Sequence, residues 1–346
     1  MTSPAKYKLK CINQDFRVTE VSLTPELEPK AKSRFTYVWL GKSGLTTFDA
    51  MEQLKDFFKL SFDDVNNQGL KDEDAITEQL ISIKKILTSK DILAYNKKHA
   101  RKHNFSRIKY IIGYGNKPAQ ERLLHGNSFS IVVRNLKKSE ATELSDYINS
   151  QRHHYFINYY DNQRFGMPGG PYNTHLIGEA IVRKNWKQAL DRLRLSRNEC
   201  PEIIGKPESN EDFKKIFKKI NPKRVQFYIS SYNSYLWNTS TSALIKKHTK
   251  SKAYSFENMG RLYLPQSHNF ECPHICEVNG YEFSHEKFSA LDKAYKRNTL
   301  ILTTIFIHTA ESDELHRNRK KISLSFFLPT GSYATMIIKQ LLLRLN

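Results

Sequence analysis

Cysteines and long apolar runs are both scarce in this chain of 346 residues. Four cysteines are too few for a disulfide framework in a chain of this length, so we expect reduced thiols and a cytoplasmic location. The longest apolar run, residues 300–307, is too short to cross a bilayer, and the first residues have no signal-peptide core. The sequence therefore indicates no membrane anchor.

Nucleotide-binding and metal-binding motifs are also missing. No Gly-x4-Gly-Lys-Ser/Thr or Gly-x-Gly-x-x-Gly string occurs, which removes support for nucleoside triphosphate or dinucleotide binding. His268, Cys272, His274 and Cys276 are zinc-ligand types, but a zinc site usually separates its ligand pairs with an intervening element. A metal-dependent nuclease or deaminase would also need a His-x-Glu motif, which is absent around this group. We therefore expect no metal.

Positive charge is what the chain has in excess. It carries 55 Lys and Arg against 35 Asp and Glu, a net charge of +20 spread along the sequence. Such an excess favours a polyanionic partner, most commonly nucleic acid, with an anionic membrane surface as the alternative. Five residues form a candidate basic belt, although each alone is more often a solvated surface charge: Arg34, Arg101, Lys102, Arg107 and Lys109.

The first half of the chain alternates between β-rich and helical patterns. Residues 8–42 contain short β-rich runs. Met51, Leu54 and Phe58 recur at helical spacing after a possible cap at Thr46 or Thr47. Further strands are predicted at 109–114 and 129–133, the second after a tight turn at residues 126–127, and a helix at 139–151.

The second half is predicted to be mainly helical before β-rich sequence returns. A loop rich in glycine and proline covers 166–171, and a polar loop covers 264–285. Helices are predicted at 175–196, 208–220 and 224–248, and strands at 299–308 and 321–328. At 346 residues with 39% hydrophobic content the chain can form two globular domains. The pattern indicates a mixed α/β domain interrupted by a helical insertion.

Five separate segments carry the most specific signal. Each is weak alone, since an acid in a polar loop such as Asp72 is usually a solvated turn residue. Together, and in this order, they resemble the TruD family of tRNA pseudouridine synthases. The segments are residues 15–20 (Asp-Phe-Arg-Val-Thr-Glu), 69–72 (Gly-Leu-Lys-Asp), 126–129 (Gly-Asn-Ser-Phe), 158–166 (Asn-Tyr-Tyr-Asp-Asn-Gln-Arg-Phe-Gly) and 326–335 (Phe-Phe-Leu-Pro-Thr-Gly-Ser-Tyr-Ala-Thr).

The resemblance implies an α+β fold and a tRNA-modifying activity. The expected fold is a pseudouridine synthase-like catalytic domain with a central mixed or antiparallel sheet, interrupted by a mainly helical TRUD insertion domain. The catalytic domain would cover 1–153 and 287–346, and the insertion 154–286. The expected substrate is tRNA, with the uridine at position 13 as target. No cofactor is expected, because the conversion is an internal rearrangement, and no obligate protein partner is evident.

The resemblance also implies roles for individual residues. Asp72 stands at the place of the family's catalytic carboxylate, and Lys71 beside it is expected to favour the ionised form or to contact a phosphate. A uridine that leaves the base stack needs aromatic walls and an amide. Four residues match those pocket positions, and four more are expected to support them. The pocket residues are Phe16, Asn127, Phe129 and Tyr333, and the supporting residues are Glu20, Lys71, Gln163 and Arg164.

Each pocket assignment has a structural alternative. Phe16 and Phe129 are, taken singly, more often core aromatics, and Asn127 after a glycine is a typical turn residue. Gln163 and Arg164 alternatively brace the junction between the domains. Glu20 is expected to pair with Lys71 or with an arginine of the pocket.

Three positions depart from the family pattern. Tyr160 replaces a Phe, and Asp161 replaces a Gly, so a negative side chain stands where the family usually has none. We expect Asp161 to affect the local backbone geometry or RNA contact. Tyr333 stands where some members have Phe, which keeps the stacking face and adds a hydroxyl.

A second class of function stays open at this point. An RNA-binding protein or RNA chaperone could keep the fold and use the positive charge without turnover. The presence of Asp72 favours the enzyme, because a pure binder has no need of a carboxylate facing anionic RNA.

Overall fold

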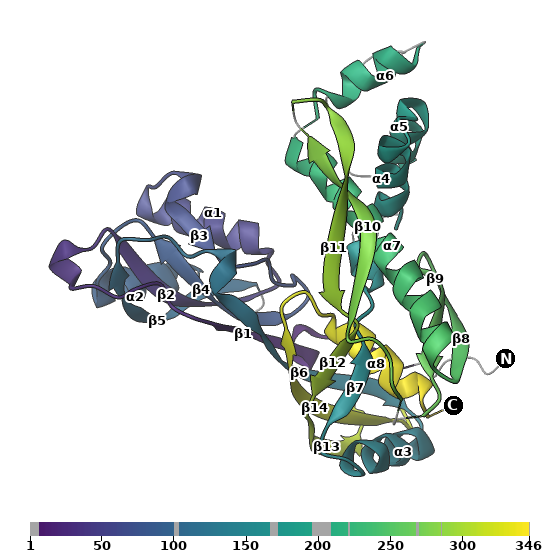
Figure 1. Cartoon of the computed structure of the whole chain (residues 1–346). Helices are drawn as coiled ribbons and strands as arrows, with labels where there is room; N and C mark the ends of the chain where they lie inside the picture. Colours follow the sequence, from purple (N-terminus) through teal and green to yellow (C-terminus); the bar gives the residue numbers. More distant parts are fainter. Residues whose placement is uncertain are drawn as a thin grey trace. The chain divides into compact units, whose positions relative to one another are not determined.

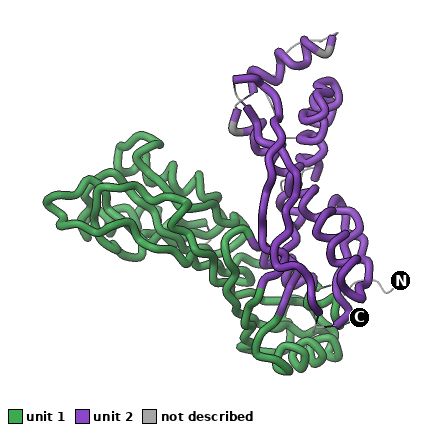
Figure 2. Tube along the Cα trace, in the orientation of Figure 1, with its two compact units in different colours: residues 1–154, 302–331, 341–346 green, residues 155–301, 332–340 purple. Residues whose placement is uncertain are grey.

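The computed structural model describes residues 7–99, 104–166, 172–195, 209–220, 222–267, 270–284 and 286–345. The chain forms two compact units, coloured separately in Figure 2: residues 1–154, 302–331 and 341–346 in the first, and 155–301 and 332–340 in the second. Each unit is a group of residues that contact one another, and such a group need not fold independently as a domain does. The domain limits expected from the sequence therefore stay a prediction. No helix of the described residues is long and apolar enough to cross a membrane.

The first unit is built on a mixed sheet, which confirms the fold class expected from the sequence. In the described residues this sheet has eight strands, in the order β13-β14-β6-β1-β4-β2-β5, with β3 paired to β4 (Figure 1). β1 and β4 run parallel, and the other pairs are antiparallel. The strands are β1 (Phe16–Ser22), β2 (Phe35–Ser43), β3 (Val65–Asn67), β4 (Ile76–Ile83), β5 (Phe105–Gly115), β6 (Leu124–Leu136), β13 (Ile305–Ser312) and β14 (Lys320–Pro329).

Helices α1 (Thr47–Phe58) and α2 (Ser89–His99) pack on one face of β2, β4 and β5. The Thr46 side chain accepts a hydrogen bond from the backbone N–H of Asp49, which confirms the predicted cap. The predicted apolar stripe of α1 is buried together with Val38 of β2 and Ile81 of β4. A third helix, α3 (Lys138–Asn149), confirms the helix predicted at 139–151.

The turn predicted at residues 126–127 is wrong. Gly126 and Asn127 lie inside β6, paired with Val21 and Glu20 of β1 on one side and with Pro329 and Leu328 of β14 on the other. A Cβ added at Gly126 would lie 2.1 Å from the carbonyl oxygen of Leu328. The glycine is therefore required by the close approach of a neighbouring strand and not by a turn.

The second unit has a helical core, as predicted, but the stretch predicted as helix at 175–196 forms two helices, separated after Val182 where Lys184 adopts a left-handed φ of 56°. Buried side chains of four helices pack with Phe283 and Phe288. The helices are α4 (Thr174–Val182), α5 (Trp186–Leu195), α6 (Asn210–Phe217) and α7 (Pro222–His248). Further elements in the described residues are β7 (His154–Ile157), which pairs with β12 (Leu300–Thr303), β8 (Ser251–Phe256), which pairs with β9 (Gly260–Pro265), and α8 (Ala334–Leu343).

The polar loop predicted at 264–285 is only partly a loop. Ile275–Ser284 forms β10, which pairs along its whole length with β11 (Ser289–Asn298). Cys276, Val278 and Phe283 are buried while exposed polar residues stand between them. The alternation of buried and exposed side chains that is typical of a half-buried strand is therefore present within this polar segment. The predicted loop at 166–171 lies, after Gly166, outside the described residues.

Candidate active site

Asp72 lies on the loop between β3 and β4, and a buried lysine fixes the backbone of this loop. Lys42 Nζ donates hydrogen bonds to the carbonyl oxygens of Asp72 at 2.7 Å, Leu45 at 2.8 Å and Lys71 at 3.3 Å. Burial lowers the pKa of Lys42 to about 8. The Thr47 hydroxyl accepts from the backbone N–H of Lys71 at 2.9 Å. The loop is thus held from β2 and α1, which presents Asp72 in one orientation.

The Asp72 carboxylate pairs with a cation that the motifs did not indicate. Lys10 Nζ lies 3.2 Å from Asp72 Oδ1, with 33% of the Asp72 side chain exposed. The same ammonium lies 4.4 Å from the centroid of the Phe16 ring. Lys10 has a φ of 55°, a left-handed conformation that costs a non-glycine residue roughly 1 kcal/mol. Lys10 therefore links the carboxylate to the aromatic residue of the first motif.

Lys71 pairs with Glu20, as one of the sequence-based expectations states. Lys71 Nζ lies 2.7 Å from Glu20 Oε2, and both side chains are buried. Glu20 Oε1 also accepts from the backbone N–H of Leu80 at 3.2 Å and from the Ser22 hydroxyl at 3.1 Å. The ammonium next to Asp72 in sequence is therefore turned into the interior toward Glu20, away from any exposed phosphate.

Two aromatic residues of the expected pocket, Phe16 and Phe129, form a continuous row with Phe326 of β14. The rings of Phe16 and Phe129 meet edge to face at 6.0 Å, and Phe129 stacks on Phe326 at 5.7 Å. Phe16 is 2% exposed and Phe129 7%. Both rings thus pack as core aromatics in this structure, and a stacking role for either stays a proposal.

Asn127 is the cross-strand neighbour of Glu20 and is half-buried. Its side-chain Oδ1 is buried without a hydrogen-bond partner among the described residues. A buried acceptor left unpaired costs free energy, so Asn127 Oδ1 is available to accept a hydrogen bond from a bound group.

The motif at 158–166 lies in the second unit and is braced by α7 and β11. Asn238 donates to the carbonyl oxygen of Tyr160 at 3.0 Å and accepts from its N–H at 2.8 Å. The guanidinium of Arg297 lies 4.0 Å from the centroid of the Tyr160 ring and donates to Asn158 Oδ1 at 2.6 Å. Arg164 donates to two serines of α7, Ser230 and Ser234. These contacts of Arg164 lie within the second unit, so its proposed roles at the junction of the domains or in supporting the pocket stay predictions.

Asp161 is buried and its carboxylate has three partners in the same unit. It accepts from the backbone N–H of Asn162 at 2.7 Å and pairs with Thr335 and Lys339 of α8. Its φ of −98° is ordinary for any residue. Asp161 therefore needs no glycine-like backbone, and its charge is turned inward to the first turns of α8.

Tyr333 lies directly before α8, also in the second unit. Its half-buried ring meets the ring of Tyr160 edge to face at 5.7 Å. Burial raises the pKa of Tyr333 to about 12, so the phenol stays protonated at neutral pH. Gln163 is exposed in η5 (Asn162–Arg164).

The expected site residues thus fall into two groups. Asp72, Lys71, Glu20, Phe16, Asn127 and Phe129 come together in the first unit, and Gln163, Arg164 and Tyr333 lie in the second. The sequence motifs missed Lys10 and Lys42. Lys10 stands six residues before Phe16 of the first motif, which is a weak signal, whereas Lys42 stands near no motif, at the end of the strand before α1.

The His/Cys group falls partly outside the described residues, which omit His268. Among the residues that are described, no group of three or more His, Cys, Asp or Glu side chains is arranged to hold a metal ion. Burial raises the pKa of the Cys272 and Cys276 thiols, which favours the thiol over the metal-binding thiolate. Cys276 packs with Trp237 and Val278 in a small apolar cluster.

Comparison with known proteins identifies the family. The sequence model of tRNA pseudouridine synthase D (TruD) matches residues 2–199, more than half of the chain. A Methanococcus maripaludis protein named "Probable tRNA pseudouridine synthase D 1" is 26% identical, over 96% of this chain and 98% of that protein. A tRNA pseudouridine synthase D from Leptospira interrogans is 25% identical, over 98% of this chain and 96% of that protein.

A solved structure confirms the fold. The crystal structure of a Methanosarcina mazei protein assigned as tRNA pseudouridine synthase D covers 99% of this chain and 94% of its own, with a TM-score of 0.65 at 21% identity. The resemblance inferred from the five segments is confirmed by the family match. The chain belongs to the TruD family of tRNA pseudouridine synthases.

Proposed function

We propose that this protein converts uridine to pseudouridine in tRNA, at position 13, with Asp72 as the essential carboxylate and without a cofactor. The family match and the names of the relatives support the reaction and the substrate class. A cytoplasmic location belongs to the same proposal, and the free thiols of Cys11, Cys272 and Cys276 are compatible with it.

The observation that carries this proposal is the way in which two lysines hold Asp72 and its loop. A carboxylate that is one-third exposed is paired with Lys10, on a loop whose carbonyls are bound by the buried ammonium of Lys42. A solvated turn residue would not need two lysines to hold it. Positioning a reactive group in this way lowers the barrier by removing the freedom that the group would otherwise lose.

The chemistry is a balanced isomerisation. The bond between ribose C1′ and N1 breaks, the base rotates, a bond forms between C1′ and C5, C5 loses its proton, and N1 gains one. Asp72 either attacks the nucleoside or removes a sugar proton. The buried, unpaired Oδ1 of Asn127 is suited to accept a hydrogen bond from the uracil N3–H, which would satisfy it on binding.

Mapping pseudouridine in RNA from cells with and without this protein tests the proposal. We expect one tRNA uridine, at position 13, to lose its modification without the protein. Purified protein should then form pseudouridine in that tRNA with no added metal or cofactor. If the protein binds tRNA tightly but modifies no RNA in either assay, the proposed activity is wrong and a binding or chaperone function replaces it.

A further inference from the structure

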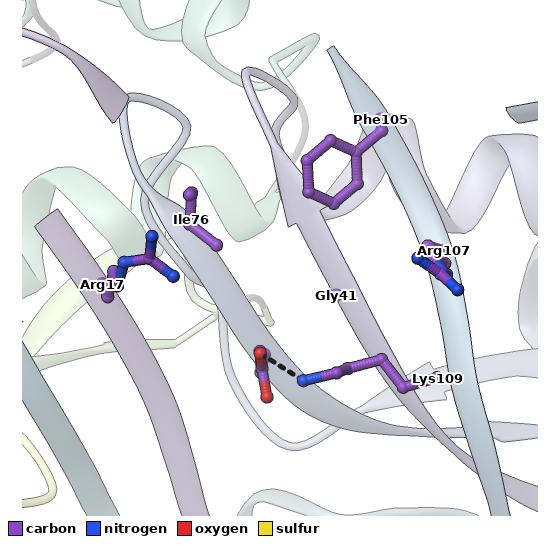
Figure 3. A pocket seen from close by; sticks show the side chains of 7 residues that line it. Arg17, Gly41, Ile76, Phe105, Arg107 and Lys109 are labelled. Atoms are coloured by element: carbon purple, nitrogen blue, oxygen red, sulfur yellow. Dashed lines mark hydrogen bonds and ion pairs between the residues drawn. The ribbon is translucent and has the colours of Figure 1, made fainter. Parts of the chain in front are cut away.

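The sheet of the first unit also carries a polar surface on the face opposite the candidate active site. A hollow of about 370 Å³ opens there, lined by residues of four neighbouring strands (Figure 3). Its residues are Arg17 of β1, Ile76 and Glu78 of β4, Gly41 of β2, and Phe105, Arg107 and Lys109 of β5. We refer to these seven residues as the Gly41 hollow.

The strand register places this hollow opposite the candidate active site. Successive side chains on a strand point to opposite faces of a sheet. Phe16 and Lys42, which contact the Lys10 and Asp72 group, directly adjoin Arg17 and Gly41, which line the hollow. A ligand segment bound in the hollow must therefore be a different segment from the one bound at the candidate active site.

The charges in the hollow are unbalanced. Lys109 Nζ is paired with Glu78 Oε1 at 2.6 Å. Arg17 and Arg107 are both exposed, and neither has a hydrogen-bond or ion-pair partner in the described part of the chain. Figure 3 draws both guanidinium groups, Arg17 on β1 and Arg107 on β5, with β4 and β2 between these two strands. Two free guanidiniums around a concave floor suit a phosphate group, since arginine binds phosphate oxygens in a bidentate manner.

Aromatic rings continue this surface along β2 and β5. Trp39 pairs with Tyr110 across the two strands, and their rings are nearly parallel, 6.4 Å apart at an angle of 11°. Tyr110 is 52% exposed. Glu78 Oε2 accepts a hydrogen bond from Trp39 Nε1 at 3.1 Å, so the carboxylate that binds Lys109 also orients the indole. Exposed rings beside cations are typical of surfaces on which nucleic-acid bases stack.

We propose that the Gly41 hollow, with Trp39 and Tyr110, binds the backbone of a second segment of the tRNA, separate from the segment that carries the target uridine. Arg17 and Arg107 contact phosphate oxygens, and the aromatic pair supports an adjacent base. This proposal rests on the proposed function for the identity of the RNA. On this proposal a folded tRNA binds more tightly than a short RNA with the same target sequence.

The test compares binding of full-length tRNA with binding of a short stem-loop that carries the target uridine. In the double variant Arg17→Ala/Arg107→Ala we expect tRNA affinity to fall by at least about tenfold, and the slope of log affinity against log salt to fall by about 1 per arginine. Stem-loop affinity should stay within about twofold. The matched control, Lys90→Ala/Lys97→Ala, removes two exposed charges from α2 that neither line the hollow nor pair with Asp72, and should change tRNA affinity by less than about twofold.

A second variant separates the hollow from general electrostatics. A Cβ at Gly41 would meet Lys109 only at 3.7 Å, an ordinary contact, so Gly41→Val fills the floor of the hollow and keeps every charge. We expect the same loss of tRNA affinity at an unchanged melting temperature. Full affinity in Gly41→Val, or equal losses for tRNA and stem-loop in the arginine variant, would overturn the proposal.

Failure of the proposed function looks different. Wild-type protein that forms no pseudouridine in any RNA refutes the activity whatever the arginine variant does. Wild-type protein that is active, together with an arginine variant that binds and modifies tRNA normally, refutes the Gly41 hollow alone.

Discussion

The ammonium of Lys10 lies between Asp72 and Phe16, 3.2 Å from the carboxylate oxygen and 4.4 Å from the centre of the ring. One cation thus connects the residue proposed for chemistry with the aromatic residue of the first motif. Because Lys71 is paired with Glu20 in the interior, Lys10 takes the place that the sequence pattern suggested for Lys71. The electrostatics of the site therefore depend on a residue outside all five motifs.

Replacing the carboxylate should separate chemistry from binding. Asp72→Asn keeps the shape and loses the charge, so we expect no detectable pseudouridine while tRNA affinity stays within about tenfold, or 1.4 kcal/mol. Single-turnover assays and equilibrium binding on the same preparation measure both. Turnover near the wild-type rate would remove Asp72 from its proposed role.

Lys10→Met should lower the rate of the chemical step more than tRNA affinity. The variant keeps the length of the side chain but removes the charge paired with Asp72, so we expect kcat to fall by at least about tenfold. Lys10→Arg restores a cation and should recover part of the loss. Equal rates for the methionine variant and the wild type would show that the pair has no function in turnover.

From the lowered pKa of Lys42 we expect a loss of activity at mildly alkaline pH. Its pKa is lowered by burial to about 8, so above that pH the amine keeps two N–H donors for three carbonyl oxygens, and the Asp72 loop loosens. We expect the single-turnover rate to decline above about pH 8.

The contribution of Lys42 to the free energy of unfolding should rise with pH over the range in which the rate falls. Between about pH 8 and about pH 10.5 the unfolded chain binds more protons at Lys42 than the folded chain, so this group makes folding more favourable as pH rises. Melting temperatures at the same pH values are the control. A rate that stays flat across this range contradicts the proposed role of Lys42.

Asp161 is expected to matter for stability. Asp161→Gly introduces the usual family residue but leaves Lys339 and Thr335 without their buried acceptor, at a cost of about 3 kcal/mol in the free energy of unfolding. The added variant Lys339→Met should recover part of this cost, because the unpaired ammonium is then removed. Denaturant unfolding of the wild type, of Asp161→Gly and of Asp161→Gly/Lys339→Met measures these changes. An unchanged midpoint for Asp161→Gly would show that the contact contributes nothing.

Tyr333 should act through its ring. Tyr333→Phe keeps the ring that contacts Tyr160 and removes only the hydroxyl, so it is expected to retain most activity. Tyr333→Ala removes a ring that contacts Tyr160, and turnover should fall by at least about tenfold if the ring stacks on a flipped base. Equal losses in both variants would assign the role to the hydroxyl. A large drop in melting temperature for the alanine variant alone would make Tyr333 a core residue.

Local features of the fold could be predicted from the sequence. The capped helix after Thr46, the helices of the second unit and the pairing of Glu20 with Lys71 agree with the structure. The family itself was readable from five ordered segments. These succeed because helical periodicity, caps and motifs depend on residues close together in the chain or on strings kept intact within a family.

Long-range packing decided the rest. Gly126 reads as a turn glycine until β14 is known to pass 2.1 Å from where its Cβ would be. Lys10 reaches Asp72, and Lys339 reaches Asp161, across 62 and 178 residues of sequence. Arg17, Gly41 and Arg107 share one hollow only because β1, β4, β2 and β5 are neighbours in the sheet. Composition established how much charge this protein carries, but strand order and register determine which charges stand together, because each depends on pairings between distant segments that no local pattern specifies.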